Sequence, residues 1–341
     1  MIPPDTTKIA VGVVGSGHFG RFHALKAAQE PRFRLIGVAD NNDERARAVG
    51  AEAGAPALSW PALLAAADAL VIATPADSHF ALARQAIEAG RHVLVEKPIA
   101  ATLAEADILA SLAAGRGTVL QVGHLERFSA AFRALVPHLR RPLYIEAVRI
   151  APFKERGTDV SVVLDLMIHD LDLVLALVGC PIATVDAVGA PVASAYEDIA
   201  NARIRFENGC VATITASRVS FRTERRMRLF AEAGYVAVDF VNRRLSLVSR
   251  AAGGTVLPGL PGFSIAESAW EDHDSLAAEH AAFAAAIKRE APVVVDAKAG
   301  REALAAALMV ADSMAESRAR AAASGLLTPG YLTPGVSPLG S

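Results

Sequence analysis

The sequence has little of several features that would assign it to a narrow protein class. It contains only two cysteines, Cys180 and Cys210, so neither a disulfide framework nor a cysteine-based zinc site is expected, and a reducing cytoplasm fits best. Its 34 basic against 36 acidic residues give a formal net charge of −2, which provides no general attraction to nucleic acid or anionic membranes. The most apolar stretch, residues 173–192, is interrupted by glycine, proline and aspartate, so we predict no membrane span.

What the chain does have is enough apolar material for about two packed domains, since 52% of its 341 residues are hydrophobic. From residue 8 to about 122, short β-rich runs alternate with alanine-rich helical segments, which predicts a parallel, doubly wound α/β sheet. Beyond Pro142, alternating strands meet at Asn208-Gly209, a strong hairpin signal. We therefore predict an α/β domain over residues 1–122 and an α+β domain with an open, largely antiparallel sheet over 123–322. A Pro/Gly-rich tail over 323–341 follows them.

The loop between the first predicted strand and helix contains three glycines, spaced two and then three residues apart. It consists of Gly15, Ser16, Gly17, His18, Phe19 and Gly20. In a strand-to-helix turn, the first glycine permits the tight turn, the second lets the backbone approach a pyrophosphate, and the third allows close helix–strand packing. The helix N-terminus then offers its N–H groups to the phosphates.

An acidic residue completes this pattern, because Asp40 ends the second predicted strand about 20 residues further on, where it can accept hydrogen bonds from both ribose hydroxyls. Without the strand, helix and acid, the glycines would indicate only an ordinary packed turn. Together they predict a dinucleotide site. Asp40 favours NAD over NADP because a carboxylate repels a 2′-phosphate, although Arg45 and Arg47 soften that preference.

A lysine follows the fourth predicted strand of the parallel sheet, in Glu96-Lys97-Pro98. Ligands of such sheets bind outside the carboxyl ends of the strands, so Lys97 would project from the cofactor edge. Partial burial there can lower the pKa of an amine toward neutrality and suit it to proton transfer. The alternative is a surface lysine paired with Glu96, and spacing alone favours neither.

A second polar group lies on an apolar helix predicted over about residues 160–178. At 3.6 residues per turn, Asp165, His169 and Asp172 lie within roughly 60° of one another, whereas Asp170 points elsewhere. Burying three ionisable groups is costly unless they satisfy one another or line a cleft. A buried network and a metal site are the alternatives to catalysis, and we expect catalysis without a metal.

These motifs, with the turn from Ala73-Thr74-Pro75 to His79, resemble in order and spacing the Gfo/Idh/MocA oxidoreductases over nearly the whole chain, from Lys8 to about Arg318. That family pairs a Rossmann domain with an open-faced sheet. The resemblance implies that Lys97, Asp165 and His169 form the catalytic set, with either the lysine or the histidine accepting the hydroxyl proton. It also implies that Thr74, Pro75, His79, Glu96 and Lys97 line the cofactor cleft. Many relatives are glycine-rich just before the polar helix, where this chain has Asp159-Val160-Ser161.

Several cations near the predicted domain crossover suggest an anionic substrate. Arg127, Arg149, Lys154 and Arg156 would suit phosphate oxygens at the cleft mouth, unless they are solvated or paired with Glu126 and Glu155. We expect Arg127, Arg149, Arg156 and Asp172 to bind substrate. The segments GHLERF, IEAVRIAPF and DVSVVLDLMIHDLDL resemble a branch of the family linked to lipopolysaccharide assembly, which implies oxidation of UDP-N-acetylglucosamine at C3.

Other functions remain open at this point. The alternatives are a dehydrogenase of inositol, of a free sugar or of a non-sugar substrate such as a dihydrodiol or bilin, and a non-catalytic NAD-binding regulator. Two predicted strands would present Arg203, Arg205, Thr213 and Thr215 on one sheet face and Ile204, Phe206 and Ile214 on the other. Since relatives associate through this sheet, the resemblance implies a homo-dimer or homo-tetramer.

Overall fold

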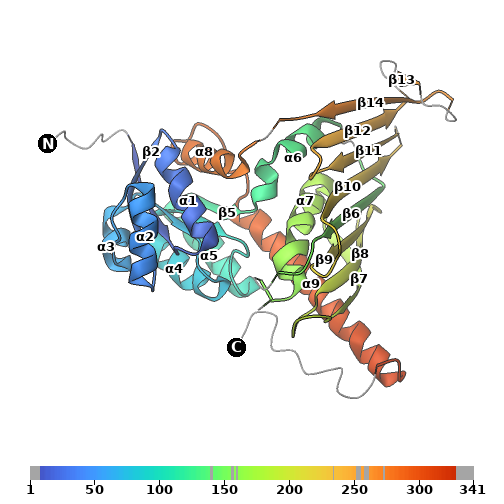
Figure 1. Cartoon of the computed structure of the whole chain (residues 1–341), viewed down its shortest axis with the longest axis horizontal. Helices are drawn as coiled ribbons and strands as arrows, with labels where there is room; N and C mark the ends of the chain where they lie inside the picture. The colour runs from blue at the N-terminus through green and yellow to red at the C-terminus, as the bar shows by residue number, and fades with distance from the viewer. Residues whose placement is uncertain are drawn as a thin grey trace. The chain divides into compact units, whose positions relative to one another are not determined.

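The computed structural model describes residues 8–138, 141–154, 157–158, 160–232, 234–250, 255–256, 261–271 and 273–327 (Figure 1). The chain folds into two compact units, Met1–Phe128 with Asp274–Arg301, and Ser129–His273 with Glu302–Ser341. Most of the predicted tail lies outside the described residues. No helix among the described residues is long and apolar enough to cross a bilayer.

The first unit contains the predicted parallel sheet, with strand order β2-β1-β3-β4-β5. Its strands are β1 (Ile9–Val14), β2 (Phe33–Ala39), β3 (Ala69–Ile72), β4 (His92–Glu96) and β5 (Leu120–Gly123). Its helices are α1 (His18–Gln29), α2 (Asp43–Ala53), α3 (Trp60–Ala66), α4 (Ala76–Glu88), α5 (Leu103–Arg116), η1 (Leu125–Phe128) and α8 (Ser275–Ile287). Helix α3 was not predicted; Ser59 caps it by accepting a hydrogen bond from the backbone of Ala62.

The segment 274–301 returns to the first unit, whereas the sequence placed it in the second domain. Helix α8 contributes Phe283 and Ala284 to the apolar core formed with β1, β2 and α1. The strand end at Val122 also donates a backbone hydrogen bond to the carbonyl of Val295 at 2.9 Å. Burial of this apolar helix face gives the return segment its place, and no local sequence pattern encodes it.

All five strands of this sheet run in the same direction, so their carboxyl ends share one edge. Gly15 follows β1, Asp40 follows β2, Thr74 lies just beyond β3, and Lys97 follows β4. The fold of the first unit therefore collects the predicted cofactor-binding residues at one edge.

The second unit is built on a nine-stranded sheet of order β13-β14-β12-β11-β10-β6-β9-β8-β7, in which only β6 and β9 pair in parallel among the described strands. The strands are β6 (Tyr144–Ile150), β7 (Ile182–Ala190), β8 (Ile199–Phe206), β9 (Val211–Ser217), β10 (Glu224–Ala231), β11 (Gly234–Asp239), β12 (Arg244–Ser249), β13 (Thr255–Val256) and β14 (Ser264–Ala269). The helices are α6 (Ala130–Leu135), η2 (Val136–His138), the π-helical turn η3 (Val163–Met167) and α7 (Ile168–Val178). Helix α9 (Ala297–Ala323) begins in the first unit and continues in the second.

The two faces of this sheet differ as predicted. Helices α6 and α7 pack on one face (Figure 1), where the side chains of Ile204, Phe206 and Ile214 are buried. On the alternate positions of the same strands, Arg203 and Arg205 are exposed. The largely antiparallel sheet and the α/β class are thus confirmed.

Candidate active site

The glycine loop has the geometry that a dinucleotide requires at two of its tightest positions. Gly15 adopts φ +91°, and a Cβ there would lie 2.5 Å from the carbonyl oxygen of Ala73. A Cβ on Gly20 would lie 1.8 Å from the carbonyl oxygen of Gly15, so helix α1 approaches the loop too closely for any side chain. Both positions therefore require glycine for a steric reason.

The remaining positions of the loop are open toward a ligand. Gly17 is the N-cap residue of α1 and would have no atom within 4 Å of an added Cβ. The first turn of α1 contains no acidic residue, and the hydroxyl of Ser16, although buried, has no hydrogen-bond partner among the described residues. Of the next two loop residues, His18 is exposed and Phe19 is half-buried. Backbone N–H groups at a helix N-terminus beside an unused hydroxyl fit the pyrophosphate of a dinucleotide.

Asp40 is held in place by the loop and by its own turn. Its carboxylate accepts the backbone N–H groups of Ser16 at 2.6 Å and Asn42 at 2.8 Å, and it pairs with the guanidinium of Arg45 at 2.7 Å. Burial would raise the pKa of Asp40, but the hydrogen bonds from Arg45, Asn42 and Ser16 lower it below its usual value. Asp40 is thus an ionised, oriented acceptor, and Arg45 is the neighbouring cation that the sequence indicated.

His79 joins the two turns that follow β3 and β4. Its ring nitrogens contact the carbonyl oxygens of Pro98 at 2.7 Å and Thr74 at 2.9 Å, and its side chain is buried. The hydroxyl of Thr74 also accepts a hydrogen bond from Ser78 at 2.7 Å. The contacts of His79 therefore hold the backbone of both turns at the sheet edge.

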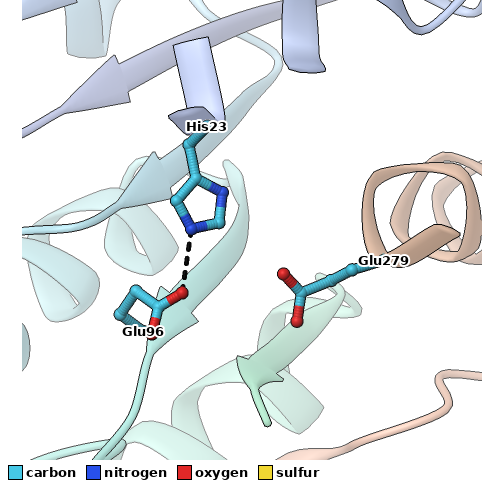
Figure 2. A group of neighbouring side chains, drawn as sticks. All are labelled: His23, Glu96 and Glu279. Carbon is cyan, nitrogen blue, oxygen red and sulfur yellow. Dashed lines mark hydrogen bonds and ion pairs between the residues drawn. The ribbon is translucent and has the colours of Figure 1, made fainter. Parts of the chain in front are cut away.

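Glu96 is part of an arrangement that sequence patterns did not reveal. One carboxylate oxygen lies 2.8 Å from Nε2 of His23 on α1 (Figure 2). The other accepts the backbone N–H of Lys97 at 3.3 Å. The carboxylate of Glu279 on α8 points toward the same group. Lys97 itself is half-buried. His23 and Glu279 lie 73 and 183 positions from Glu96 in the chain, so no local signal connects them.

The polar helix of the second unit begins differently from the prediction. Residues 163–167, which include Asp165, form a π-helical turn, and the α-helix with His169 and Asp172 starts only at Ile168. A π-turn is wider than 3.6 residues per turn, so the predicted angle between Asp165 and His169 does not apply. Both side chains are half-buried, whereas Asp172 is 1% exposed. Such π-turns occur frequently at functional sites.

Asp165 lies against a glycine in the segment before this helix. A Cβ on Gly157, which adopts φ +80°, would lie 3.0 Å from Oδ2 of Asp165. The guanidinium of Arg218 donates to the carbonyl oxygens of Gly157 and of Val160, and pairs with buried Asp198 at 2.7 Å. A buried arginine thus secures the backbone that adjoins Asp165.

The arginines expected to bind substrate lie in different surroundings. Arg149 is 3% exposed, and its guanidinium donates two hydrogen bonds to Asp170, at 2.8 and 3.1 Å. This differs from the expected place at a cleft mouth, because the covered face of β6 directs Arg149 into the unit, where Asp170 pairs with it. Arg127 in η1 is half-buried, Lys154 is exposed, and Arg156 lies outside the described residues.

Together these features define a protein with a Rossmann-type dinucleotide-binding unit and an α+β unit whose π-turn and helix α7 carry ionisable side chains. Residues 9–124 match the oxidoreductase family with an NAD-binding Rossmann fold, and residues 131–237 match the GFO/IDH/MocA C-terminal domain. The chain belongs to the Gfo/Idh/MocA family and is an oxidoreductase acting on CH–OH groups.

Three relatives illustrate the range of similarity. The chain is 45% identical to the UDP-N-acetylglucosamine 3-dehydrogenase of Acidithiobacillus ferrooxidans over 88% of this chain and 95% of the relative. A solved structure of that enzyme superposes with a TM-score of 0.85, covering 90% of this chain and 97% of the other at 44% identity. An inositol 2-dehydrogenase of Rhizobium meliloti is 27% identical over 91% and 98% of the two chains. The scyllo-inositol dehydrogenase of Lactobacillus casei, solved with NAD(H) and scyllo-inositol, shares the fold at a TM-score of 0.76 and 19% identity, covering 91% of this chain and 98% of the other.

Proposed function

We propose that the protein is an NAD-dependent dehydrogenase that oxidises the 3-hydroxyl of UDP-N-acetylglucosamine or a closely related nucleotide sugar. The observation that carries this proposal is the 45% identity, over 95% of its length, to the enzyme of that name from Acidithiobacillus ferrooxidans. Lys97, Asp165 and His169, the set that we assign to catalysis, are all present in this chain. Their retention argues against a regulator that only binds the cofactor.

The chemistry requires a hydride acceptor and a proton acceptor. NAD, when bound, supplies the hydride acceptor, and the substrate carbon that loses the hydride becomes the carbonyl carbon of a keto sugar. Either Lys97 or His169 accepts the hydroxyl proton, and Asp165 belongs to the same catalytic set. The loop residues 15–20 and Asp40 hold the cofactor, with Thr74, Pro75, His79 and Glu96 shaping the sheet edge around it. We propose NAD over NADP because the Asp40 carboxylate is ionised and oriented.

For the substrate we retain Arg127, Arg156 and Asp172 and leave out Arg149. The guanidinium of Arg149 is engaged by Asp170 in a buried ion pair, and its removal from that pair would strand a buried carboxylate.

We also propose that the protein acts in the cytoplasm as a homo-dimer or homo-tetramer formed through the second sheet. The sheet face opposite α6 and α7 presents Tyr144, Phe230 and Tyr235. The ring centre of Phe230 lies 5.8 Å from that of Tyr144 and 5.4 Å from that of Tyr235.

A substrate panel tests the proposal. NADH formation is measured with UDP-N-acetylglucosamine, UDP-glucose, N-acetylglucosamine, myo-inositol and glucose. We expect turnover with the first, and loss of at least about 10²-fold in kcat for Lys97→Met and His169→Asn. Lys288→Met, which removes an exposed lysine of the first unit, is the matched control. Turnover of inositol or a free sugar without UDP-sugar activity would contradict the nucleotide-sugar assignment.

The second candidate is an inositol or free-sugar dehydrogenase, which the match to the inositol 2-dehydrogenase of Rhizobium meliloti over 98% of its length favours. The same panel separates it from the first. A non-sugar dehydrogenase would turn over none of these substrates but would still lose activity in the Lys97→Met variant. A non-catalytic NAD-binding regulator would bind NAD in calorimetry, and both active-site variants would leave its behaviour unchanged.

A further inference from the structure

Four ionisable side chains form a buried cluster beneath the Glu96-Lys97 turn of the first unit. His23 on α1 and both Glu279 and His280 on α8 are fully buried, and Glu96 ends β4. Figure 2 shows three of the four, His23, Glu96 and Glu279. One ligand-type atom each of His23, Glu96 and Glu279 lies within 4.8 Å of the others. So many ionisable groups are not buried together in an apolar core without a compensating arrangement of protons.

The hydrogen bonds of the two histidines establish a direction. Nδ1 of His23 lies 2.9 Å from Nε2 of His280, and Nε2 of His23 lies 2.8 Å from a carboxylate oxygen of Glu96. Nδ1 of His280 is buried without a hydrogen-bond partner among the described residues. A buried N–H without an acceptor is costly, so we assign the proton of His280 to Nε2, where it donates to His23.

This assignment determines the state of His23. Because its Nδ1 accepts from His280, its own proton lies on Nε2 and is donated to Glu96. Both imidazoles are then neutral, and the burial of His280, with the nearby His23 and Lys26, lowers the pKa of His280 well below its usual value. The chain of donors therefore ends at Glu96, whose second oxygen accepts the backbone N–H of Lys97.

Glu279 is the remaining member of the cluster. Neither of its carboxylate oxygens has a hydrogen-bond partner within the described part of the chain, although they are fully buried and face the Glu96 carboxylate. An ionised Glu279 would be a buried charge without a donor, beside a like charge. Burial and the charge of Glu96 accordingly raise the pKa of Glu279 well above its usual value.

We propose that Glu279, His280 and His23 are positioning residues for the Glu96-Lys97 turn: a neutral Glu279 and the directional chain from His280 through His23 keep Glu96 as the single negative charge of this cluster beside Lys97. The inference rests on the proposed function only where it concerns Lys97 as an acid–base group. Among the described residues, His79 from α4 acts electrostatically on Glu96, and Lys26 from α1 acts on His280. A second ionised carboxylate here would favour the ammonium form of Lys97 and oppose its action as a base.

Infrared spectroscopy tests the neutral state of Glu279 without using activity. In D₂O at neutral pH, the spectrum of the full-length protein minus that of Glu279→Gln should contain the carbonyl stretch of a protonated carboxylic acid. The matched control is Glu88→Gln, which removes a glutamate whose side chain is 41% exposed and paired with Arg84. Its difference spectrum should show only the bands of an ionised carboxylate. Carboxylate bands in the Glu279→Gln difference spectrum would overturn the proposal.

The donor chain is tested by a pair of variants at His280. Glutamine places an amide N–H close to the position of the imidazole Nε2–H, whereas leucine removes the donor at a similar volume. We expect the pH profile of kcat/KM to have one limb that is lost in Lys97→Met and therefore reports on this lysine. His280→Gln should leave that limb in place, whereas His280→Leu should move it toward lower pH. Without the donor, Nδ1 of His23 loses its hydrogen bond and the ring is held less firmly, so the Glu96 carboxylate is less firmly fixed beside Lys97 and supports the lysine ammonium less. A shift of one pH unit changes the rate on that limb about tenfold.

The outcomes separate the inference from the proposed function. Equal profiles for His280→Gln and His280→Leu in folded protein would overturn the positioning role. One equivalent of a divalent metal bound by the purified protein and lost from Glu279→Gln would also overturn it, because ligation by His23, Glu96 and Glu279 requires an ionised Glu279. Full activity of Lys97→Met would instead refute the proposed function, and the infrared result would still decide the state of Glu279.

Discussion

We predict that replacing Asp40 changes the preference between NAD and NADP, and the contacts of its carboxylate set the expected magnitude. Replacing Asp40 with serine removes an ionised carboxylate that is 6% exposed and pairs with Arg45 at 2.7 Å. Two consequences follow for the bound dinucleotide. The ribose hydroxyls of NAD lose a charged acceptor, and the 2′-phosphate of NADP no longer meets a negative group, while the guanidinium of Arg45 is released to contact it.

The magnitude follows from these two effects. Hydrogen bonds to a charged group contribute about 1.5–3 kcal/mol. Repulsion between a carboxylate and a phosphate about 4 Å apart is about 4 kcal/mol at an effective dielectric constant near 20, and solvent around the exposed Arg45 reduces it. A combined change of about 3–4 kcal/mol corresponds to a factor of about 10²–10³ in the ratio of kcat/KM for NAD to that for NADP.

Steady-state kinetics with both cofactors, supported by calorimetric binding, measures this ratio. The matched control is Asp43→Ser, which removes an exposed carboxylate three residues further on, in the first turn of α2. It should leave the ratio within about threefold, since the charge lies outside the Asp40 contacts. If Asp40→Ser changed the ratio no more than this control does, the assignment of Asp40 as the discriminating residue would be refuted.

Three further predictions concern the second unit. Arg149→Met should lower the free energy of unfolding, measured in urea titrations, by about 3–5 kcal/mol because it leaves buried Asp170 without its partner. The control Arg228→Met, on the open sheet face, should lower it by at most about 1 kcal/mol. Equal losses in the two variants would contradict the buried-pair interpretation. Burial, with the nearby Cys180, raises the pKa of the Cys210 thiol to about 11, so a thiol reagent at pH 8 should modify Cys180 first, and faster labelling of Cys210 would argue against this. Burial would raise the pKa of Asp198, but hydrogen bonds, first from the backbone N–H groups of Val192 and Ala193, lower it below its usual value. The ionised carboxylate therefore stabilises the fold fully above the ordinary aspartate pKa of about 3.9, and this stabilisation is lost as the pH falls through the lower pKa of the folded state. Asp198→Asn should have a lower free energy of unfolding than the parent at pH 7, and its free energy of unfolding should fall less as the solution is acidified. An acid unfolding transition identical to that of the parent would contradict the assignment.

The residues with local signals were predicted because their constraints are local. The turn after β1 needs glycines at positions 15 and 20 for steric reasons that involve neighbouring backbone, and the strand period of two separates Ile204 and Phe206 from Arg203 and Arg205. Strands of one parallel sheet bring their ends to one edge, so their order in the chain was sufficient to place the residues predicted to bind the cofactor there.

Tertiary packing decided the features that depend on residues distant in the chain. The return of helix α8 brings Glu279 and His280 to Glu96, and it follows from burying Phe283 and Ala284 in the first unit. Asp170 binds Arg149 because α7 packs on β6, and a π-turn at Asp165 replaces the regular helix that the apolar period predicted. Sequence periodicity specifies which face of an element is buried, whereas the partner that meets a buried charge is determined only when the elements pack together.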